Sequence, residues 1–184
     1  TRPVRERPAD QVRTMVAQGL ARTGYDEVSL TSLSTAAFSD ISTLVSDIMD
    51  DSEAAGAATV SVSLPSLRVD AFGVAIAAQL QRARRSGLTF APEAGTWRMR
   101  QIINKLIREE DLYEAVDAAF SQGWQRVKLY FLIGLPSETD EDTLGIAELA
   151  RNCAEIGRRH NRRASVTASV GGFVPKPFTP FQWF

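Results

Sequence analysis

Glu93 stands where a predicted strand gives way to a predicted helix. The stretch TFAPEAGTWRMRQIINK, residues 89–105, predicts a strand, a turn from Pro92 to Gly95 and a helix that begins at Thr96. Parallel sheets and barrels bind ligands at the carboxyl ends of their strands. A carboxylate at that place predicts a site for a polar ligand centred on Glu93. The alternative is a turn carboxylate that stabilises the helix dipole.

Hydroxyl side chains alternate with aliphatic ones in three other predicted strands. The alternating residues lie in the segments DEVSLTS (26–32), TVSVSL (59–64) and ASVTASVGGFV (164–174). Successive strand residues face opposite sides of a sheet, so one side is aliphatic and the other is lined with hydroxyls. The same alternation places Glu93 and Lys128 on the hydroxyl side. Lys128 is therefore a candidate for binding anionic groups of a substrate or cofactor.

Strand and helix alternate along the chain. Predicted helices begin near Pro8, Ser39, Phe72, Thr96, Glu109 and Thr139, and predicted strands cover 26–32, 59–64, 88–91, 126–133 and 164–174. Helix-length connections indicate βαβ units and a mainly parallel sheet. A shared hydroxyl side suits the lumen of a TIM-like (β/α) barrel better than a sheet covered by helices on both faces. An antiparallel sheet with one wet face is the alternative.

Composition limits the class of protein. The chain has 184 residues, 44% of them hydrophobic, and a net charge of −1, so no overall field attracts nucleic acid or membrane. It is long enough for one domain, predicted over residues 1–184. No apolar run reaches the length of a membrane span and no leader is evident, which predicts a cytoplasmic protein. One cysteine, Cys153, excludes an internal disulfide and predicts no metal site in this chain.

A second strand-to-helix turn lies at Ile133-Gly134-Leu135-Pro136, followed by an acidic helix start. Alone, it is explained as a well-formed turn. Together with the Glu93 turn it resembles the radical S-adenosylmethionine (SAM) superfamily. Matching motifs are F-x-x-E-A-G-T at residues 90–96, I-N-K at 103–105, I-G-L-P-x-E-T at 133–139 and the tail at 173–183. The first residues, RPVRERP, resemble the segment that follows the cluster-binding loop, so the resemblance spans Arg2 to Trp183.

The resemblance implies a partial barrel with five of the family's six strands. The family's C-x3-C-x2-C loop, which holds a [4Fe-4S] cluster, is not in this sequence. It and the first strand are expected upstream of Thr1. The parent protein would cleave SAM reductively at the cluster, on an unknown substrate, and this fragment alone would be inactive. Adjoining domains are expected, among them a cobalamin-binding-like domain as in a bacterial fusion family.

The resemblance also assigns contacts with SAM, while no catalytic residue is assigned. Glu93 matches a contact with the ribose or the amino group. Ser29, Thr31 and Ser32 match the strand end that contacts the methionyl amine. The residues that match adenine contacts are Ile133, Gly134, Leu135, Phe173 and Val174. Arg98 and Lys105 are candidates for the SAM carboxylate, with a solvated helix face as the alternative for both.

Two other features leave alternatives open. The run Arg158-Arg159-His160-Asn161-Arg162-Arg163 suggests RNA binding or a solvated helix end. Nucleic-acid binding is therefore left undecided. A non-catalytic fragment that binds a nucleotide-like ligand is the alternative function. A hydrolase is disfavoured because no G-x-S-x-G motif occurs and His160 is the only histidine.

Overall fold

The computed structural model describes residues 5–32, 38–54, 60–63 and 88–184. The chain divides into two compact units, Thr1–Ser86 and Gly87–Phe184, and each is described by itself. Several predicted features lie outside the described residues: the connector at 55–58, the strand end at Leu64-Pro65 and the helix around Phe72.

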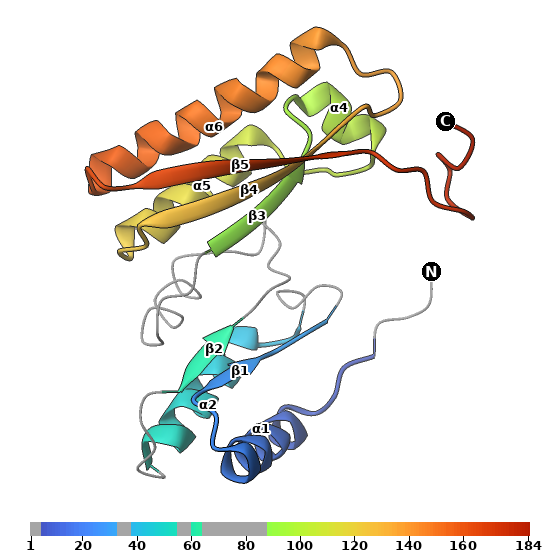
Figure 1. The fold of residues 1–184 in the computed structure, drawn as a ribbon. Helices are drawn as coiled ribbons and strands as arrows, with labels where there is room; N and C mark the ends of the chain where they lie inside the picture. Colours follow the sequence, from blue (N-terminus) through green and yellow to red (C-terminus); the bar gives the residue numbers. More distant parts are fainter. Residues whose placement is uncertain (1–4, 33–37, 55–59, 64–87) are drawn as a thin grey trace. The chain divides into compact units, whose positions relative to one another are not determined.

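The described part of the first unit contains two helices and two short parallel strands (Figure 1). These are α1 (Ala9–Thr23), β1 (Glu27–Ser29), α2 (Ile41–Ala54) and β2 (Ser61–Ser63). Helix α1 follows Pro8 and ends at Gly24, whose φ of 71° is the left-handed conformation that glycine adopts without steric cost. Arg13 of α1 donates to Asp47 of α2 at 2.9 Å, which ties the two helices together.

The predicted apolar stripe of α2 is confirmed, because Ile41, Leu44, Val45, Ile48 and Met49 are all buried. In β2, Ser61 and Val62 are both buried and Ser63 is half-buried, so burial does not alternate along this short strand.

The second unit has three parallel strands in the order β3-β4-β5, which are β3 (Leu88–Glu93), β4 (Arg126–Ile133) and β5 (Ser165–Gly172). Helices α4 (Trp97–Ile102) and α5 (Glu109–Ser121) connect β3 to β4, and α6 (Asp140–His160) connects β4 to β5. Figure 1 shows α5 and α6 on one side of this sheet. The parallel pairing confirms the βαβ prediction and excludes the antiparallel alternative for these strands.

The two faces of β4 differ as the sequence predicts. Val127, Leu129 and Phe131 are buried, whereas Lys128 and Tyr130 are exposed. The buried residues pack with the apolar stripes of α5 and α6, which include Phe120, Leu149 and Cys153. A mixed α/β architecture with parallel strands is thus confirmed in both units. Among the described residues, no helix is both long and apolar enough to cross a membrane.

Candidate functional site

Glu93 lies at the carboxyl end of β3, in a turn that the local sequence explains well. The register with β4 shifts between Phe90 and Glu93, so β3 contains one extra residue there. Glu93 has a φ of 70°, and such left-handed backbone is uncommon outside glycine and is frequent at ligand sites. Thr96 then accepts a hydrogen bond from the Met99 amide at 3.3 Å and caps α4. The carboxylate of Glu93 is held at this end of the strand.

The surroundings of Glu93 supply one cation. Lys105 Nζ lies 3.5 Å from Glu93 Oε1, and both side chains are about one-third exposed, at 35% and 30%. The carboxylate is therefore partly paired but still accessible. A ligand hydroxyl or ammonium group can reach it, and Lys105 can meet an anionic group beside it.

The carboxyl end of β4 offers open backbone at Gly134. Its φ is 78°, and nothing lies within 4 Å of the place that a Cβ would occupy. The Gly134 amide donates to the Glu138 carboxylate across the turn. Leu135 and Pro136 are buried, while Ile133 is 37% exposed. A ligand can therefore approach the Gly134 backbone with an apolar floor beside it.

A small apolar cluster joins the ends of the three strands. Ala94, Met99 and Leu135 are buried in it, with Ile103, Leu132 and Phe173 packed against them. The Phe173 amide donates to the Ile133 carbonyl at 2.8 Å, which continues the pairing of β5 beyond Gly172. The next residue, Val174, is 72% exposed. The structure thus brings Leu135 and Phe173 together at one rim, with Glu93 directly before the buried Ala94.

Asp142 connects the two turns of this rim, although no sequence motif singled it out. Its buried carboxylate accepts hydrogen bonds from Thr96 Oγ1 at 2.5 Å, from Thr139 Oγ1 at 2.8 Å and from Arg98. Arg98 also donates to the Ser137 carbonyl at 2.8 Å. Although burial alone raises a carboxyl pKa, the hydrogen bonds from Arg98, Thr96 and Thr139 outweigh it and hold the pKa of Asp142 well below its usual range.

The proposed role of Arg98 changes with this observation. The sequence left it between a contact with the SAM carboxylate and a solvated helix face. Its guanidinium instead joins α4 to the start of α6 through Asp142 and Ser137. Because that cation is already occupied by a buried carboxylate, Lys105 is the better candidate for an anionic ligand group.

The backbone of the Glu93 turn also meets the start of α6 directly. A Cβ at Gly95 would lie 2.4 Å from the Asp142 carbonyl oxygen and 2.4 Å from the Ile146 nitrogen. A Cβ at Gly145 would meet the Thr96 side chain and the Gly95 backbone, with its nearest contact at 2.9 Å. The start of α6 therefore rests against the backbone of the Glu93 turn. Only glycine at both positions permits this approach.

Lys128, another predicted site residue, lies apart from this rim within the second unit. Lys128 is five residues before the end of β4, about 16 Å by the rise of a strand, and its Nζ lies 5.8 Å from the centre of the Tyr130 ring. It pairs in register with Thr89 and Thr167, which agrees with the predicted hydroxyl-lined face. Ser29 ends β1 in the first unit, and Thr31 and Ser32 follow it; all three are exposed.

Comparison with known proteins identifies the family of this chain. The family model described as the radical SAM superfamily matches residues 1–150. The chain belongs to the radical SAM superfamily. An uncharacterized protein of Methanocaldococcus jannaschii is 33% identical over 180 residues, which cover 98% of this chain and 37% of that relative. The chain therefore spans well under half the length of this archaeal protein.

Radical SAM proteins combine SAM with a [4Fe-4S] cluster, so the residues of this chain can be tested against both groups. The cluster does not fit. Cys153 is the only cysteine, it lies fully buried on the core side of α6, and burial raises the pKa of its thiol to about 12. A cluster needs several thiolates. Within the described part of the chain, no three His, Cys, Asp or Glu side chains are grouped to hold a metal.

The adenosyl part of SAM does fit the rim of this radical SAM chain. An adenosyl group presents a flat apolar ring and two ribose hydroxyls. The rim offers an apolar cluster at Leu135 and Phe173, open backbone at Gly134 and the accessible carboxylate of Glu93. Pockets for such ligands combine an apolar lining with few polar groups.

Proposed function

We propose that this chain is the SAM-binding part of a radical SAM enzyme whose parent protein cleaves SAM reductively. The observation that carries the proposal is the shared rim of β3, β4 and β5, where the Glu93 turn, Gly134 and Phe173 meet one apolar cluster. Membership of the radical SAM superfamily indicates that the ligand is SAM. The position at the carboxyl ends of parallel strands supports the same conclusion, since ligands of such folds bind there.

The proposed contacts follow the chemistry of each group. The Glu93 carboxylate accepts a hydrogen bond from a ribose hydroxyl or the amino group of SAM. Adenine packs on Leu135 and Phe173, with Ile133 and Val174 at its edges and the Gly134 backbone beside it. Ser29, Thr31 and Ser32 provide hydroxyls and carbonyls for the methionyl amine. Lys128 would contact a more distant anionic group.

We further propose that the two units form one partial (β/α) barrel domain over residues 1–184. In that arrangement the hydroxyl-bearing strand faces line a lumen. The iron-sulfur cluster would be held by cysteines outside this chain, because Cys153 is unsuited to ligate it. The substrate, the adjoining domains and any cobalamin domain belong to the whole protein. By this proposal the chain alone has no radical chemistry.

The second candidate function is a non-catalytic fragment that binds a nucleotide-like ligand. The observation that favours it is the single buried thiol together with an apolar, carboxylate-bearing rim, since the described residues contain no group of His, Cys, Asp or Glu that could hold iron. The two candidates differ in whether binding at the rim depends on a cluster.

The decisive experiment uses the parent protein, reconstituted anaerobically with iron and sulfide. We expect SAM binding, measured by calorimetry, and 5'-deoxyadenosine after addition of a reductant. Glu93→Gln removes one charge-assisted hydrogen bond, so the Kd for SAM rises roughly tenfold or more. Glu114→Gln, an exposed acid on α5, serves as the matched control and leaves the Kd unchanged.

Two outcomes would contradict the proposal. An unchanged Kd for Glu93→Gln would remove Glu93 from the SAM site. Equal SAM affinity with and without iron, together with no 5'-deoxyadenosine, would favour the non-catalytic fragment instead.

A further inference from the structure

The charges of the second unit are unevenly distributed along its sequence. Residues 118–137 contain no acidic residue, and neither does the chain after Glu155. Six cations of these two stretches lie shortly before or just inside the start of β4 or β5: Arg126, Lys128, Arg158, Arg159, Arg162 and Arg163. The chain as a whole has a net charge of −1, so its average composition conceals this local excess.

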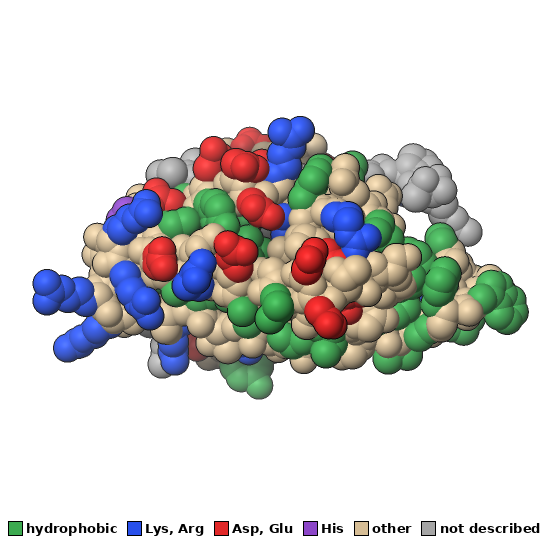
Figure 2. Space-filling view, turned by 90° about the horizontal axis from the view of Figure 1, so that it is seen from above, with side chains coloured by type: hydrophobic (Ala, Val, Ile, Leu, Met, Phe, Trp, Pro, Cys, Tyr) green, Lys and Arg blue, Asp and Glu red, His purple; other side chains and the backbone are tan. Residues whose placement is uncertain are grey.

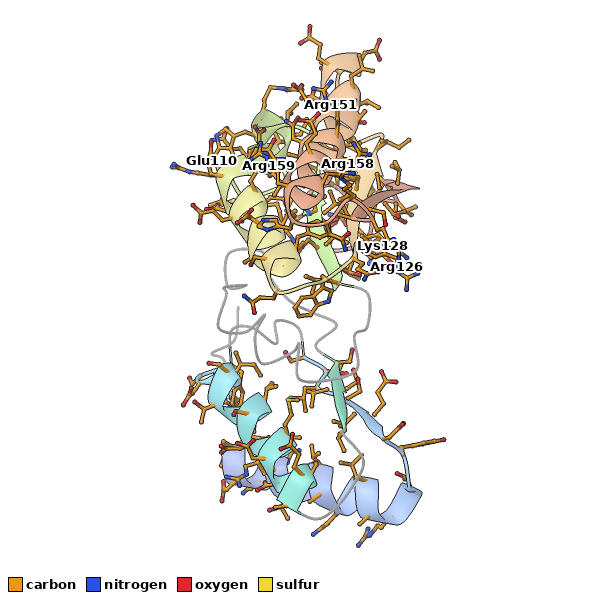
Figure 3. The ribbon with its side chains drawn as sticks, turned by 90° about the vertical axis from the view of Figure 1, so that its left-hand side faces the viewer. Glu110, Arg126, Lys128, Arg151, Arg158 and Arg159 are labelled. Carbon is orange, nitrogen blue, oxygen red and sulfur yellow. The ribbon has the colours of Figure 1, made fainter. Side chains whose placement is uncertain are left out.

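The fold gathers these six cations at the amino-terminal end of the sheet. Arg126 is the first residue of β4 and pairs with Ser165, the first residue of β5. Arg158 and Arg159 lie in the last turn of α6, and Arg162 and Arg163 lie in the turn that leads into β5. Figure 3 shows Arg126, Lys128, Arg158 and Arg159 on the side of the second unit that faces the viewer. We call these six residues the basic end.

The basic end is exposed and carries little compensating charge. All six side chains are exposed, and none of them forms an ion pair with another described residue. Among the described residues, the acidic side chain that contacts this end of α6 is Asp117, whose Oδ1 lies 2.7 Å from His160 Nε2. In Figure 2, basic side chains project at the left, around the carboxyl end of α6.

Stabilisation of the helix dipole accounts for only part of the arrangement. Cations in the last turn of a helix, such as Arg158 and Arg159, are favourable there. The effect falls off beyond that turn, so it does not explain Arg162 and Arg163. It also does not explain Arg126 and Lys128, which belong to a different element. Like charges assembled from three segments repel one another unless a polyanion lies between them.

The types of residue indicate which polyanion. Five of the six cations are arginines, whose guanidinium groups bind phosphate through paired hydrogen bonds. Ser165 and Thr167 of β5 lie in register beside Arg126 and Lys128, so hydroxyl groups stand next to the cations. Ribose 2'-hydroxyls are suitable partners for them. The basic end is formed by the end of a helix, a turn and the start of a β-strand. Such an irregular surface follows a flexible single-stranded nucleic acid more readily than it enters the groove of a duplex.

We propose that the basic end binds the phosphate backbone of single-stranded RNA. The surface begins at the opposite end of β4 from the Glu93 rim, and the first and last residues of this strand are about 23 Å apart. It therefore serves to hold RNA and not to bind SAM. The proposal is independent of the radical SAM chemistry, and it predicts the same RNA affinity with and without SAM.

The test measures fluorescence anisotropy of a labelled 12-nucleotide single-stranded RNA with the full chain at several salt concentrations. Each phosphate contact contributes a slope of about −0.7 to the logarithm of affinity against the logarithm of salt. Replacing Arg158, Arg159, Arg162 and Arg163 by glutamine should reduce the slope by up to about 2.8 and weaken binding at least roughly tenfold.

A matched control removes the same number of charges elsewhere. Arg5, Arg7, Arg22 and Arg151 are exposed arginines outside the basic end, and replacing them by glutamine should leave affinity and slope nearly unchanged. Thermal melts of both variants verify that each remains folded. DNA of the same sequence should bind more weakly because it lacks the 2'-hydroxyl.

Several results would overturn the proposal. Absence of RNA binding would do so, as would equal losses in the two variants, since the effect would then follow net charge alone. Equal affinity for DNA would refute the assignment to RNA. If vesicles containing phosphatidylserine displaced the RNA at the same concentrations and lost binding with the same four substitutions, the basic end would instead be a membrane surface.

Discussion

The carboxylate of Asp142 is buried and accepts hydrogen bonds from Thr96, Thr139 and Arg98. We predict that Asp142→Asn lowers the free energy of unfolding by about 2 kcal/mol at pH 7, because an amide cannot satisfy three donors in the same way. Denaturant titration measures the change. Asp140→Asn, an exposed neighbour in the same helical turn, is the control and should cost less than about 0.5 kcal/mol.

The same carboxylate predicts a dependence on pH. Its pKa is lower in the folded protein than in the unfolded chain, where an aspartate titrates near about 3.9. The stabilisation is therefore complete above the unfolded pKa and is lost as the pH falls through the folded one. The difference in unfolding free energy between the natural protein and Asp142→Asn should be constant from pH 7 to 5 and shrink below about pH 4. A difference that grew on acidification would contradict this assignment.

Cys153 is predicted to be inert while the protein is folded. Its thiol is fully buried and burial raises its pKa to about 12, so little thiolate forms at pH 8. Alkylation by iodoacetamide, followed by mass spectrometry, should be slow for the native chain and rapid in 6 M guanidinium. In the reconstituted parent protein, Cys153→Ala should leave the iron content unchanged. Loss of iron in that variant would make Cys153 a ligand after all.

At the scale of residues, the sequence predicted where a residue lies in its element better than which side chain it contacts. The helix starts at Thr96 and Thr139 followed from local pattern, and the structure confirms them. The pairing of Arg98 with Asp142 spans 44 residues and depends on how α6 begins against the Glu93 turn. Local periodicity contains no information about such a contact.

At the scale of elements, the contact between the Glu93 turn and α6 rests on two glycines. We predict that Gly95→Ala destabilises the protein by about 2 kcal/mol or more, because the added methyl group would meet backbone atoms that cannot move aside cheaply. Gly171→Ala in β5 is the control, since nothing lies within 4 Å of its Cβ position. Melting temperatures compare the two. Similar values for both variants would show that the turn relaxes without cost.

Element boundaries were predicted well where an apolar stripe was long. The strand at residues 126–133 and the helices α1, α5 and α6 agree closely with the pattern. The strand predicted at 26–32 is only Glu27–Ser29 in the structure, because pairing with β2 extends over three residues. In β2, burial does not follow the alternation of side-chain types, because Ser61 is buried as Val62 is. The burial of a short strand depends on the elements that pack against it, so its own sequence predicts burial poorly.

At the scale of the whole molecule, protection from exchange should be greatest in β4. This strand is paired on both sides over most of its length and buries Val127, Leu129 and Phe131. Strand β1 pairs over three residues and is mostly exposed. We predict that amides of β4 exchange at least roughly tenfold more slowly than those of β1, as measured by hydrogen-deuterium exchange and mass spectrometry. Equal rates would indicate one cooperative unit across the chain.

Whole-molecule properties were the hardest to obtain from sequence. Parallel βαβ order followed from the spacing of strands and helices and is confirmed. Closure into a barrel depends on strand tilt and stagger, which alternation alone does not specify. The basic end could not be predicted from the net charge either. The value of −1 sums acidic and basic residues that the fold places in different regions.

The direct contact between Gly95 and Gly145 has a consequence for how such chains diverge. Neither the Glu93 turn nor α6 can acquire a side chain at its glycine unless the other segment moves away, so the two segments should be inherited as a pair. Recombination that exchanged residues 134–146 for those of a distant relative would succeed only when residues 93–98 travelled with them.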